Sequence, residues 1–365
     1  MNFPLDASQY EIIRQIFSNK YCSTYIARCL INEKLVCLRK IDLEKNQDLL
    51  NIIGNETRNW STISHPNMMT YYASFIDQNF LLIISEMVDQ GSLLDILHFQ
   101  YSDGIKDELL IASILQQILQ FLKYYHQIHQ VHRSLETNNI YVFQNGSIKV
   151  GGFWQARSFL QDGFLKNERA SSIDSSCYTA PELIEKGKCY SQSVDIWSLG
   201  IIAYELAVGK TPYSDLEPLR QVKEILSGTS PSLPSKSCPN RRSSFDPSVS
   251  LNKENNFSPV FCDFVKQCLD KDPIKRPSAA DLLKHKFVLL AKSKDYIYVN
   301  LMIHLPPLSQ RIALHDQQND DKNLYLKNSL STQNPITSSE RPQKKVVKKG
   351  RFTLIYPTKS TTSLL

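Results

Sequence analysis

The chain has 365 residues, of which 42% are hydrophobic, so it can bury a large core and still leave a polar tail. Its 42 basic and 36 acidic residues give a net charge of +6, which is too small an excess to indicate a nucleic-acid-binding protein. Eight scattered cysteines without a Cys-x-x-Cys pair indicate neither a disulfide framework nor a zinc site. No apolar run is long enough to span a bilayer.

The predicted elements form a strand-rich part followed by a helical part. The last predicted strand of the first part is Ile83-Ile84-Ser85-Glu86-Met87-Val88. Apolar residues recur at helical spacing between Glu108 and Ile128 and predict a long helix there. The chain is therefore expected to divide into residues 1–87, residues 88–290 with a flexible polar insert at 227–258, and a mostly flexible extension at 291–365.

A series of motifs in fixed order identifies the family that the chain resembles. The order and spacing of these motifs are similar to those of protein kinases over roughly residues 10–290. The resemblance implies an α+β, bilobal protein-kinase-like fold with an antiparallel-sheet small lobe and a mainly helical large lobe. The motifs are His65-Pro66-Asn67, His132-Arg133-Ser134-Leu135-Glu136-Thr137-Asn138-Asn139, Ala180-Pro181-Glu182, Asp195-Ile196-Trp197-Ser198-Leu199-Gly200 and Asp272-Pro273-Ile274-Lys275-Arg276-Pro277.

The positions that carry kinase chemistry differ from the family pattern. Ser134 stands where the catalytic loop has an aspartate that accepts the substrate proton, and a neutral hydroxyl is a poor proton acceptor. Arg39 replaces the third-strand lysine, and Gly152 replaces the magnesium-binding aspartate. Asn139 remains of the two metal ligands, while Glu136 replaces the loop lysine. The sequence thus predicts a pseudokinase that is not an enzyme and has no metal site.

Three further positions bear on the small lobe. The three loop glycines of kinases would fall at Phe17, Asn19 and Cys22, none of which is glycine. Lys40 follows Arg39 directly, so on a strand it should point to the opposite face of the sheet. Glu56 lies at the position of the helix glutamate and is expected to pair with Arg39.

The predicted hinge between the lobes follows the usual kinase pattern. The Glu86 carbonyl and the Val88 amide are placed to bind adenine, and Arg39 could offset phosphate charge in place of magnesium. ATP binding without magnesium is one expectation, and a site filled by Phe17 and Trp154 is the other. The expected nucleotide-site residues are Arg39, Glu56, Glu86, Val88 and Asn139.

Within the kinases, the chain resembles the sterile-twenty-related adaptor (STRAD) pseudokinases. The shared features are Val131-His132-Arg133-Ser134, Arg39, Gly152 and the phrases Phe257–Phe261 and Phe264–Leu269. The resemblance implies an allosteric activator that binds a liver-kinase-B-type kinase together with a helical-repeat scaffold of the Mo-twenty-five type. No tryptophan follows Trp197 in the sequence, so the contact that the family's Trp-Glu-Phe tail makes with the scaffold is not expected here.

The active-like shape that such an activator needs would come from contacts between the lobes. Trp60, Phe153 and His132 fall where kinases stack side chains between the lobes. Asp195 is placed to tether the catalytic-loop backbone beneath this stack, and Arg276 to pair with Glu182.

Two other functions stay open at this point. One is a scaffold for a different kinase, and the other is a weak kinase with unusual metal use, which an Asn139→Ala change would abolish. The unpaired cysteines favour a cytoplasmic location, and the basic run Lys344–Arg351 leaves shuttling to the nucleus open. Neither a nucleic acid nor a membrane is an expected partner.

Overall fold

The fold is described from a computed structural model, in which two compact units, Met1–Ile312 and Ala313–Leu365, are distinguished. The first unit contains both lobes. The structure describes residues 3–18, 22–45, 54, 60–153, 156–158, 160–161, 164–165, 176–185, 188–234, 257–303, 305–308, 310–311, 344–349 and 352–357.

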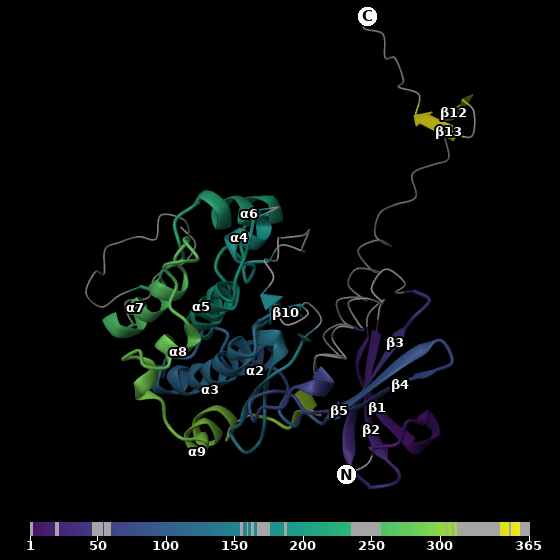
Figure 1. The fold of residues 1–365 in the computed structure, drawn as a ribbon, viewed down its shortest axis with the longest axis horizontal. Coiled ribbons are helices and arrows are strands. Elements are labelled where there is room, and N and C mark those ends of the chain that lie inside the picture. Colours follow the sequence, from purple (N-terminus) through teal and green to yellow (C-terminus); the bar gives the residue numbers. More distant parts are fainter. Residues whose placement is uncertain are drawn as a thin grey trace, which may run out of the picture. The chain divides into compact units, whose positions relative to one another are not determined.

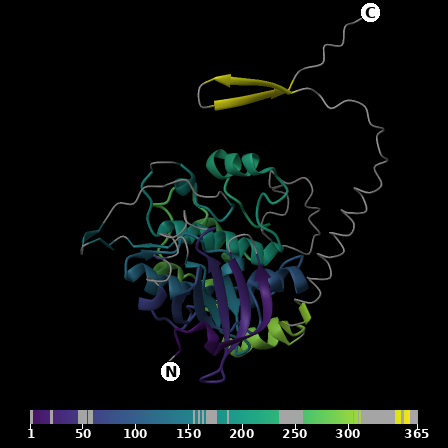
Figure 2. The same ribbon diagram turned by 90° about the vertical axis from the view of Figure 1, so that its right-hand side faces the viewer.

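The small lobe is built on a five-stranded antiparallel sheet with the strand order β1-β2-β3-β5-β4. Figure 2 shows these strands side by side. The β5 strand ends at Glu86 and leads directly into the hinge. The strands are β1 Tyr10–Ser18, β2 Cys22–Cys29, β3 Leu35–Asp42, β4 Tyr71–Asp77 and β5 Phe80–Glu86.

The two faces of β3 have different neighbours. Val36 and Leu38 are buried in a cluster that covers one face of the sheet. Ile41, on the opposite face, belongs to the large core that the two lobes share. Because side chains alternate along a strand, Arg39 lies on the Ile41 face and Lys40 on the other. The expected separation of Arg39 and Lys40 is therefore confirmed.

The large lobe is mainly helical, as Figure 1 shows. Its longest helix, α3, runs from Glu108 to Gln127, where the apolar spacing predicts it. The Asp107 side chain starts this helix by accepting hydrogen bonds from the Leu109 and Leu110 amides. The other helices are α2 Leu93–Gln100, α4 Pro181–Ile184, α5 Ser193–Val208, α6 Pro218–Ser227, α7 Pro259–Cys268, α8 Ala279–Leu282 and α9 Lys294–Ile297.

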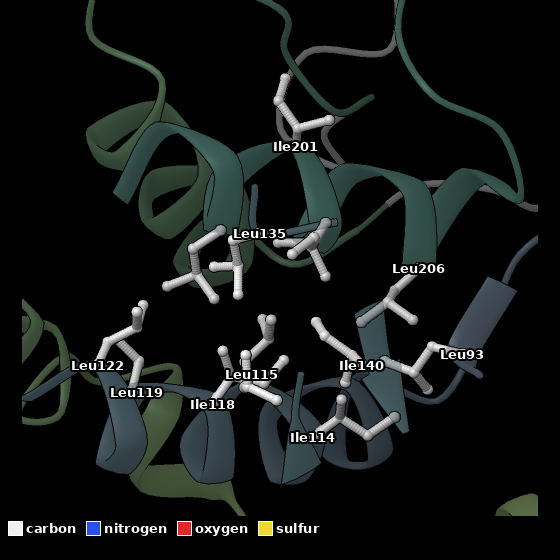
Figure 3. Close-up of a cluster of buried hydrophobic side chains, with 14 of the residues drawn as sticks. Leu93, Ile114, Leu115, Ile118, Leu119, Leu122, Leu135, Ile140, Ile201 and Leu206 are labelled. Carbon is white, nitrogen blue, oxygen red and sulfur yellow. The ribbon is translucent and has the colours of Figure 1, made fainter. Parts of the chain in front are cut away.

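The core of the large lobe lies between α3 and α5. Figure 3 shows apolar side chains of α3, such as Leu115 and Ile118, facing those of α5, such as Leu206. Leu135 of the catalytic loop reaches into the same layer and is fully buried. Burial of a leucine side chain is worth roughly 1.5–3 kcal/mol, so this contact fixes the loop to the helices.

Short strands and turns complete the first unit. The 3-10 helix η3, Thr137–Asn139, ends the catalytic loop, and β7 pairs antiparallel with β8 directly after it. The apolar residues of segment 296–303 pack on the large lobe, since Ile297, Leu301 and Met302 are buried in its core. The remaining short elements are η1 Ala7–Gln9, β6 Gln130–Val131, β7 Ile140–Val142, β8 Ile148–Val150, β9 Arg157–Ser158, β10 Leu160–Gln161, β11 Phe164–Leu165, η5 Val288–Leu290 and η6 Tyr298–Met302.

The second unit contains an antiparallel hairpin of β12, Lys344–Lys349, and β13, Phe352–Pro357. The basic run of the sequence therefore begins as a strand.

The predicted α+β bilobal fold, with an antiparallel sheet in the small lobe and helices in the large lobe, is confirmed. In the part of the chain that is described, no helix is both long and apolar enough to cross a membrane.

Candidate functional site

The catalytic loop is held from below by the carboxylate of Asp195. This side chain is fully buried at the start of α5, and it accepts hydrogen bonds from the His132 amide at 2.9 Å and the Arg133 amide at 2.8 Å. Burial alone would raise the pKa of Asp195, but the hydrogen bond and charge of His126 keep this pKa below its ordinary value. The tether expected from Asp195 is therefore confirmed.

The Ser134 side chain turns toward the segment that follows β8. Its Oγ donates a 2.6 Å hydrogen bond to the Gly152 carbonyl, and this bond joins the catalytic-base position to the metal-aspartate position. A neutral hydroxyl engaged in this way is a weak proton acceptor compared with a carboxylate.

Gly152 and Asn139 occupy adjacent space. Gly152 has a φ of 76°, and an ideal Cβ placed there would lie 2.6 Å from both Oδ1 and Nδ2 of Asn139. The Asn139 amide is held in that place because its Nδ2 donates to the Ser134 carbonyl at 2.8 Å and to Glu136 Oε1 at 3.1 Å. A side chain at position 152 would therefore displace Asn139.

Magnesium, the ion that the kinase fold implies, prefers six oxygen ligands in octahedral geometry. Position 152 supplies no side-chain oxygen, which leaves Asn139, Glu136 and the Ser134 hydroxyl, whose proton is bonded to the Gly152 carbonyl, as the nearby oxygen-bearing side chains of the loop. Burial also raises the pKa of Glu136, which disfavours its charged form. Among the residues that the structure describes, no group of three or more His, Cys, Asp or Glu side chains could hold a metal ion. The donor set does not fit magnesium.

Arg39 is placed on β3 opposite Thr24 of β2 and Ile83 of β5. It is close enough to Cys37 to influence this half-buried thiol: burial raises the pKa of Cys37, and the Arg39 charge lowers it in part. Lys40 has a different partner, since its Nζ lies 3.9 Å from the centre of the Phe80 ring on the other face. Glu56, the expected partner of Arg39, lies outside the described residues.

A column of rings connects the two lobes. The Trp60 ring lies 6.1 Å from the Phe153 ring, and Phe153 lies 4.9 Å from His132, measured between centroids. Phe121 of α3 continues the column at 5.9 Å from Phe153. All four side chains are buried, so the expected stacking between the lobes is confirmed.

The ring of His132 is held as a neutral imidazole. Its Nε2 lies 2.9 Å from the Gly151 carbonyl, and its Nδ1 accepts a 3.3 Å hydrogen bond from the Ser134 amide. A ring that donates through Nε2 and accepts through Nδ1 is the neutral tautomer. Burial lowers the pKa of His132, which agrees with this assignment.

The hinge is tied to the large lobe through Glu86. Lys149 of β8 donates to both carboxylate oxygens of Glu86, at 2.8 and 2.6 Å, and the Thr70 amide also donates to Oε1. Within the described residues, the Val88 amide has no backbone or side-chain acceptor. Phe17, which could have filled the nucleotide site, is 53% exposed, and Trp154 lies outside the described residues.

The Ala180-Pro181-Glu182 motif, which ends the activation segment of a kinase, is anchored by a buried ion pair. The Arg276 guanidinium donates to both oxygens of Glu182, at 2.7 and 2.9 Å, and its side chain has no solvent exposure. The expected pairing of Arg276 with Glu182 is confirmed. This bidentate geometry is the strong form of an arginine–carboxylate contact.

Some site contacts were not foreseen from the sequence. The Lys149–Glu86 pair and the Ser134–Gly152 bond join residues 63 and 18 positions apart, where no local pattern indicates a contact. Tyr178 also donates a hydrogen bond to Glu205 below the catalytic loop. A signal for Lys149 could have been its alternation with buried Ile148 and Val150 on β8, which places it on the other face of this strand.

Comparison with known proteins decides the family. The model of the protein kinase domain matches residues 10–288. This chain belongs to the protein kinase family. It is 32% identical over 333 residues to serine/threonine-protein kinase fray2 of Dictyostelium discoideum, which covers 91% of this chain and 30% of that protein. It is 33% identical over 312 residues to serine/threonine-protein kinase fray1 of the same organism, covering 85% of this chain and 51% of that protein.

A third relative is germinal center kinase 3 of Caenorhabditis elegans, which is 32% identical over 317 residues, or 83% of this chain and 51% of that protein. The chain thus spans about a third to a half of the length of these relatives.

The comparisons correct one expectation. The prediction that the chain is not an enzyme is wrong by this evidence, because relatives at 31 to 33% identity are named serine/threonine-protein kinases and point to a kinase. The prediction rested on a few positions, chiefly Arg39, Ser134 and Gly152, whereas the kinase relationship extends over most of the chain.

Proposed function

We propose that this protein kinase-family chain regulates a second serine/threonine kinase by binding to it. The proposed partner is a liver-kinase-B-type kinase, assisted by a helical-repeat scaffold of the Mo-twenty-five type, as the resemblance to the STRAD adaptors suggests. This role requires a stable active-like shape and does not require phosphoryl transfer by the chain itself. It is equally compatible with such transfer.

The observation that carries the proposal is the ring column of Trp60, Phe153, His132 and Phe121. These contacts join the small lobe to α3 and the catalytic loop through buried side chains of the chain itself. The Asp195 tether and the Arg276–Glu182 pair hold the loop and the activation-segment end below the column. A partner that binds this shape would be shifted toward its own active form, and a 100-fold shift needs only about 3 kcal/mol of differential binding energy.

A purine nucleotide is the proposed ligand of the hinge. The Val88 amide is available to it, and the Glu86 side chain is fixed by Lys149, which keeps the end of β5 in place. We propose ATP binding without magnesium, with the Arg39 charge near the phosphates, because the donor set at Gly152 and Asn139 does not suit that ion. Adenine recognition uses backbone groups and is independent of the catalytic positions.

Serine/threonine phosphorylation by this chain is the second candidate function. The names of the fray and germinal center kinase relatives favour it. Transfer at this site would have to proceed with a serine at position 134 and with Asn139 as the remaining member of the usual pair of metal ligands, since Gly152 stands at the place of the other.

The deciding experiment measures peptide phosphorylation by a liver-kinase-B-type kinase, with and without this chain and the scaffold. A catalytically dead partner kinase serves as the blank. A rise that disappears with the dead partner supports regulation, whereas a signal that persists with the dead partner assigns the transfer to this chain. Absence of both a complex and a rise would overturn the regulatory proposal.

A matched pair of variants links the result to the ring column. Trp60→Ala removes a buried ring of the column, and Phe99→Ala removes a ring on α2 that is 42% exposed. Regulation through the active-like shape predicts that only the Trp60 variant loses the stimulation.

A further inference from the structure

The C-terminal part of the first unit returns to the hinge. After η6, residues 305–308 and 310–311 reach the segment Gln90–Asp95, which lies about 220 positions earlier in the chain. Arg311 is buried by this contact and is only 6% exposed. A turn prepares this contact, because the Gln310 and Arg311 amides both donate to the Pro307 carbonyl, at 2.9 and 3.2 Å.

The Arg311 guanidinium donates hydrogen bonds to two backbone carbonyls. Its Nη2 donates to the Gln90 carbonyl at 2.6 Å, and its Nε donates to the Pro306 carbonyl at 3.0 Å. One end of the fork therefore holds the hinge and the other end holds its own segment. Hydrogen bonds from a charged donor are about twice as strong as those between neutral groups.

The electrostatic surroundings explain why the guanidinium is tolerated at low exposure. Burial lowers the pKa of Arg311, and the charge of Asp95 raises it in part. Asp95 itself is fixed by the capping box of α2, in which its Oδ2 accepts from the Ser92 amide at 3.0 Å and the Ser92 hydroxyl at 2.8 Å. Arg311 Nη1 is buried and has no hydrogen-bond partner within the described residues.

Gly91 lies directly against this contact. It has a φ of 83°, which favours glycine, and an ideal Cβ there would lie 3.2 Å from Leu308 Cδ1 and 3.5 Å from Arg311 Nη1. The Gly91 carbonyl accepts a 3.0 Å hydrogen bond from Val142, so the large lobe holds the other side of the same turn. Gln90 and Gly91 follow Val88 by two and three residues, so the turn that they form continues directly from the hinge.

We infer that Arg311 is a positioning residue of the hinge: by holding the Gln90 carbonyl it fixes the turn that orients the Val88 amide toward a purine. The inference rests on the proposed purine binding at the hinge for its functional consequence. The hold itself can be measured without a ligand.

The test uses the full chain with Arg311→Met, which keeps a long stem and loses the fork, and Arg311→Lys, which keeps the charge. The matched control is Arg220→Met, since Arg220 is an exposed arginine on α6. Hydrogen exchange of the ligand-free proteins is followed by mass spectrometry on peptides that cover Glu86–Asp95. ATP with EDTA and adenosine are then titrated by calorimetry.

Loss of a charged hydrogen bond should speed exchange in these hinge peptides about tenfold in the Met variant, less in the Lys variant and not in the control. ATP and adenosine should both bind several-fold more weakly to the Met variant. Unchanged hinge exchange in a folded Met variant, with the thermal midpoint as the check, overturns the inference.

Failure of the proposed function gives a different result. If the wild-type chain binds neither ATP nor adenosine, the proposal that the hinge binds a purine is overturned. The contact between Arg311 and Gln90 is then tested by hydrogen exchange alone, which either differs between wild type and the Met variant or does not.

Discussion

The Ser134 hydroxyl donates a 2.6 Å hydrogen bond to the Gly152 carbonyl, so the two positions that differ most from the kinase pattern are bonded to each other. The same segments are joined by the Gly151 amide, which donates to the Asn139 carbonyl at 2.8 Å. The catalytic loop and the end of β8 thus form one hydrogen-bonded unit. Substitutions at these positions should be felt as changes in stability as well as in activity.

Changing Ser134 should destabilise the chain, and an aspartate at this position should destabilise it more than an alanine does. Ser134→Ala loses one partly buried hydrogen bond, which costs about 1 kcal/mol in the free energy of unfolding. Ser134→Asp should cost more at neutral pH, because an ionised carboxylate cannot donate to the Gly152 carbonyl and faces its oxygen. Urea unfolding at pH 7 measures both values.

The exposed Ser214 provides the control for this series, and Ser214→Ala should change the free energy of unfolding by less than about 0.5 kcal/mol. An aspartate variant as stable as wild type would show that the hydroxyl bond to Gly152 does not hold the loop.

Gly152 and Asn139 should be energetically coupled. Gly152→Ala alone should cost about 2–4 kcal/mol, because the new Cβ overlaps the Asn139 amide and the positive φ is strained. With Asn139→Ala in the background the overlap is gone and only the strain remains. A double-mutant cycle in urea should therefore give a coupling of about 1–2 kcal/mol, and a purely additive result would contradict the overlap.

His132 should make the chain less stable in mild acid. The folded state keeps this imidazole neutral and its pKa low, whereas the unfolded chain takes up a proton below its ordinary pKa of about 6.5. The unfolded state then binds more protons, so the free energy of unfolding should fall by up to about 1.4 kcal/mol per pH unit as the pH drops below 6.5.

The effect of His132 is seen in how steeply the free energy of unfolding changes with pH, because the His132 variant also differs from wild type in its stability at pH 7. His132→Phe loses two hydrogen bonds and should be less stable at pH 7, yet its stability should fall less steeply between pH 6.5 and 5. His65, whose pKa is also lowered by burial, contributes to the wild-type slope and remains in the variant. Equal slopes would mean that His132 is protonated in the folded chain.

The fold could be predicted from the sequence because its signals are local or ordered along the chain. The spacing of apolar residues gave α3 to within one residue of its observed end, and strand alternation separated Arg39 from Lys40. The kinase motifs then determined the topology that no single pattern could provide.

The site could be predicted only in part, because its decisive contacts are between distant residues. Glu86 was assigned through its hinge carbonyl, while its side-chain contact with Lys149, 63 residues away, depends on how the lobes meet. The hold of Arg311 on Gln90 is more distant still, and its segment looked like part of a flexible tail. The expectation of a non-enzyme failed for another reason, since a few substituted positions were weighed against a relationship that covers the whole kinase domain.

The buried pair of Arg276 and Glu182 should be costly to break and much less costly to replace. Arg276→Met leaves a carboxylate that is 4% exposed without its partner, and the expected loss is about 3–5 kcal/mol in the free energy of unfolding. Glu182→Leu alone should be similarly harmful, because it leaves the buried guanidinium with only backbone acceptors, among them the carbonyls of Asp270 and Ser193.

The double variant Arg276→Met with Glu182→Leu separates the pair from its surroundings. Removing both charges should recover about half or more of the loss, since replacement of a buried ion pair by apolar groups is often close to neutral. The exposed pair of Lys210 and Asp215 is the control, and its disruption by Lys210→Met should cost less than about 1 kcal/mol. If the double variant is as unstable as the sum of the two single variants, the arginine acts mainly through its backbone bonds to Asp270 and Ser193 and not through Glu182.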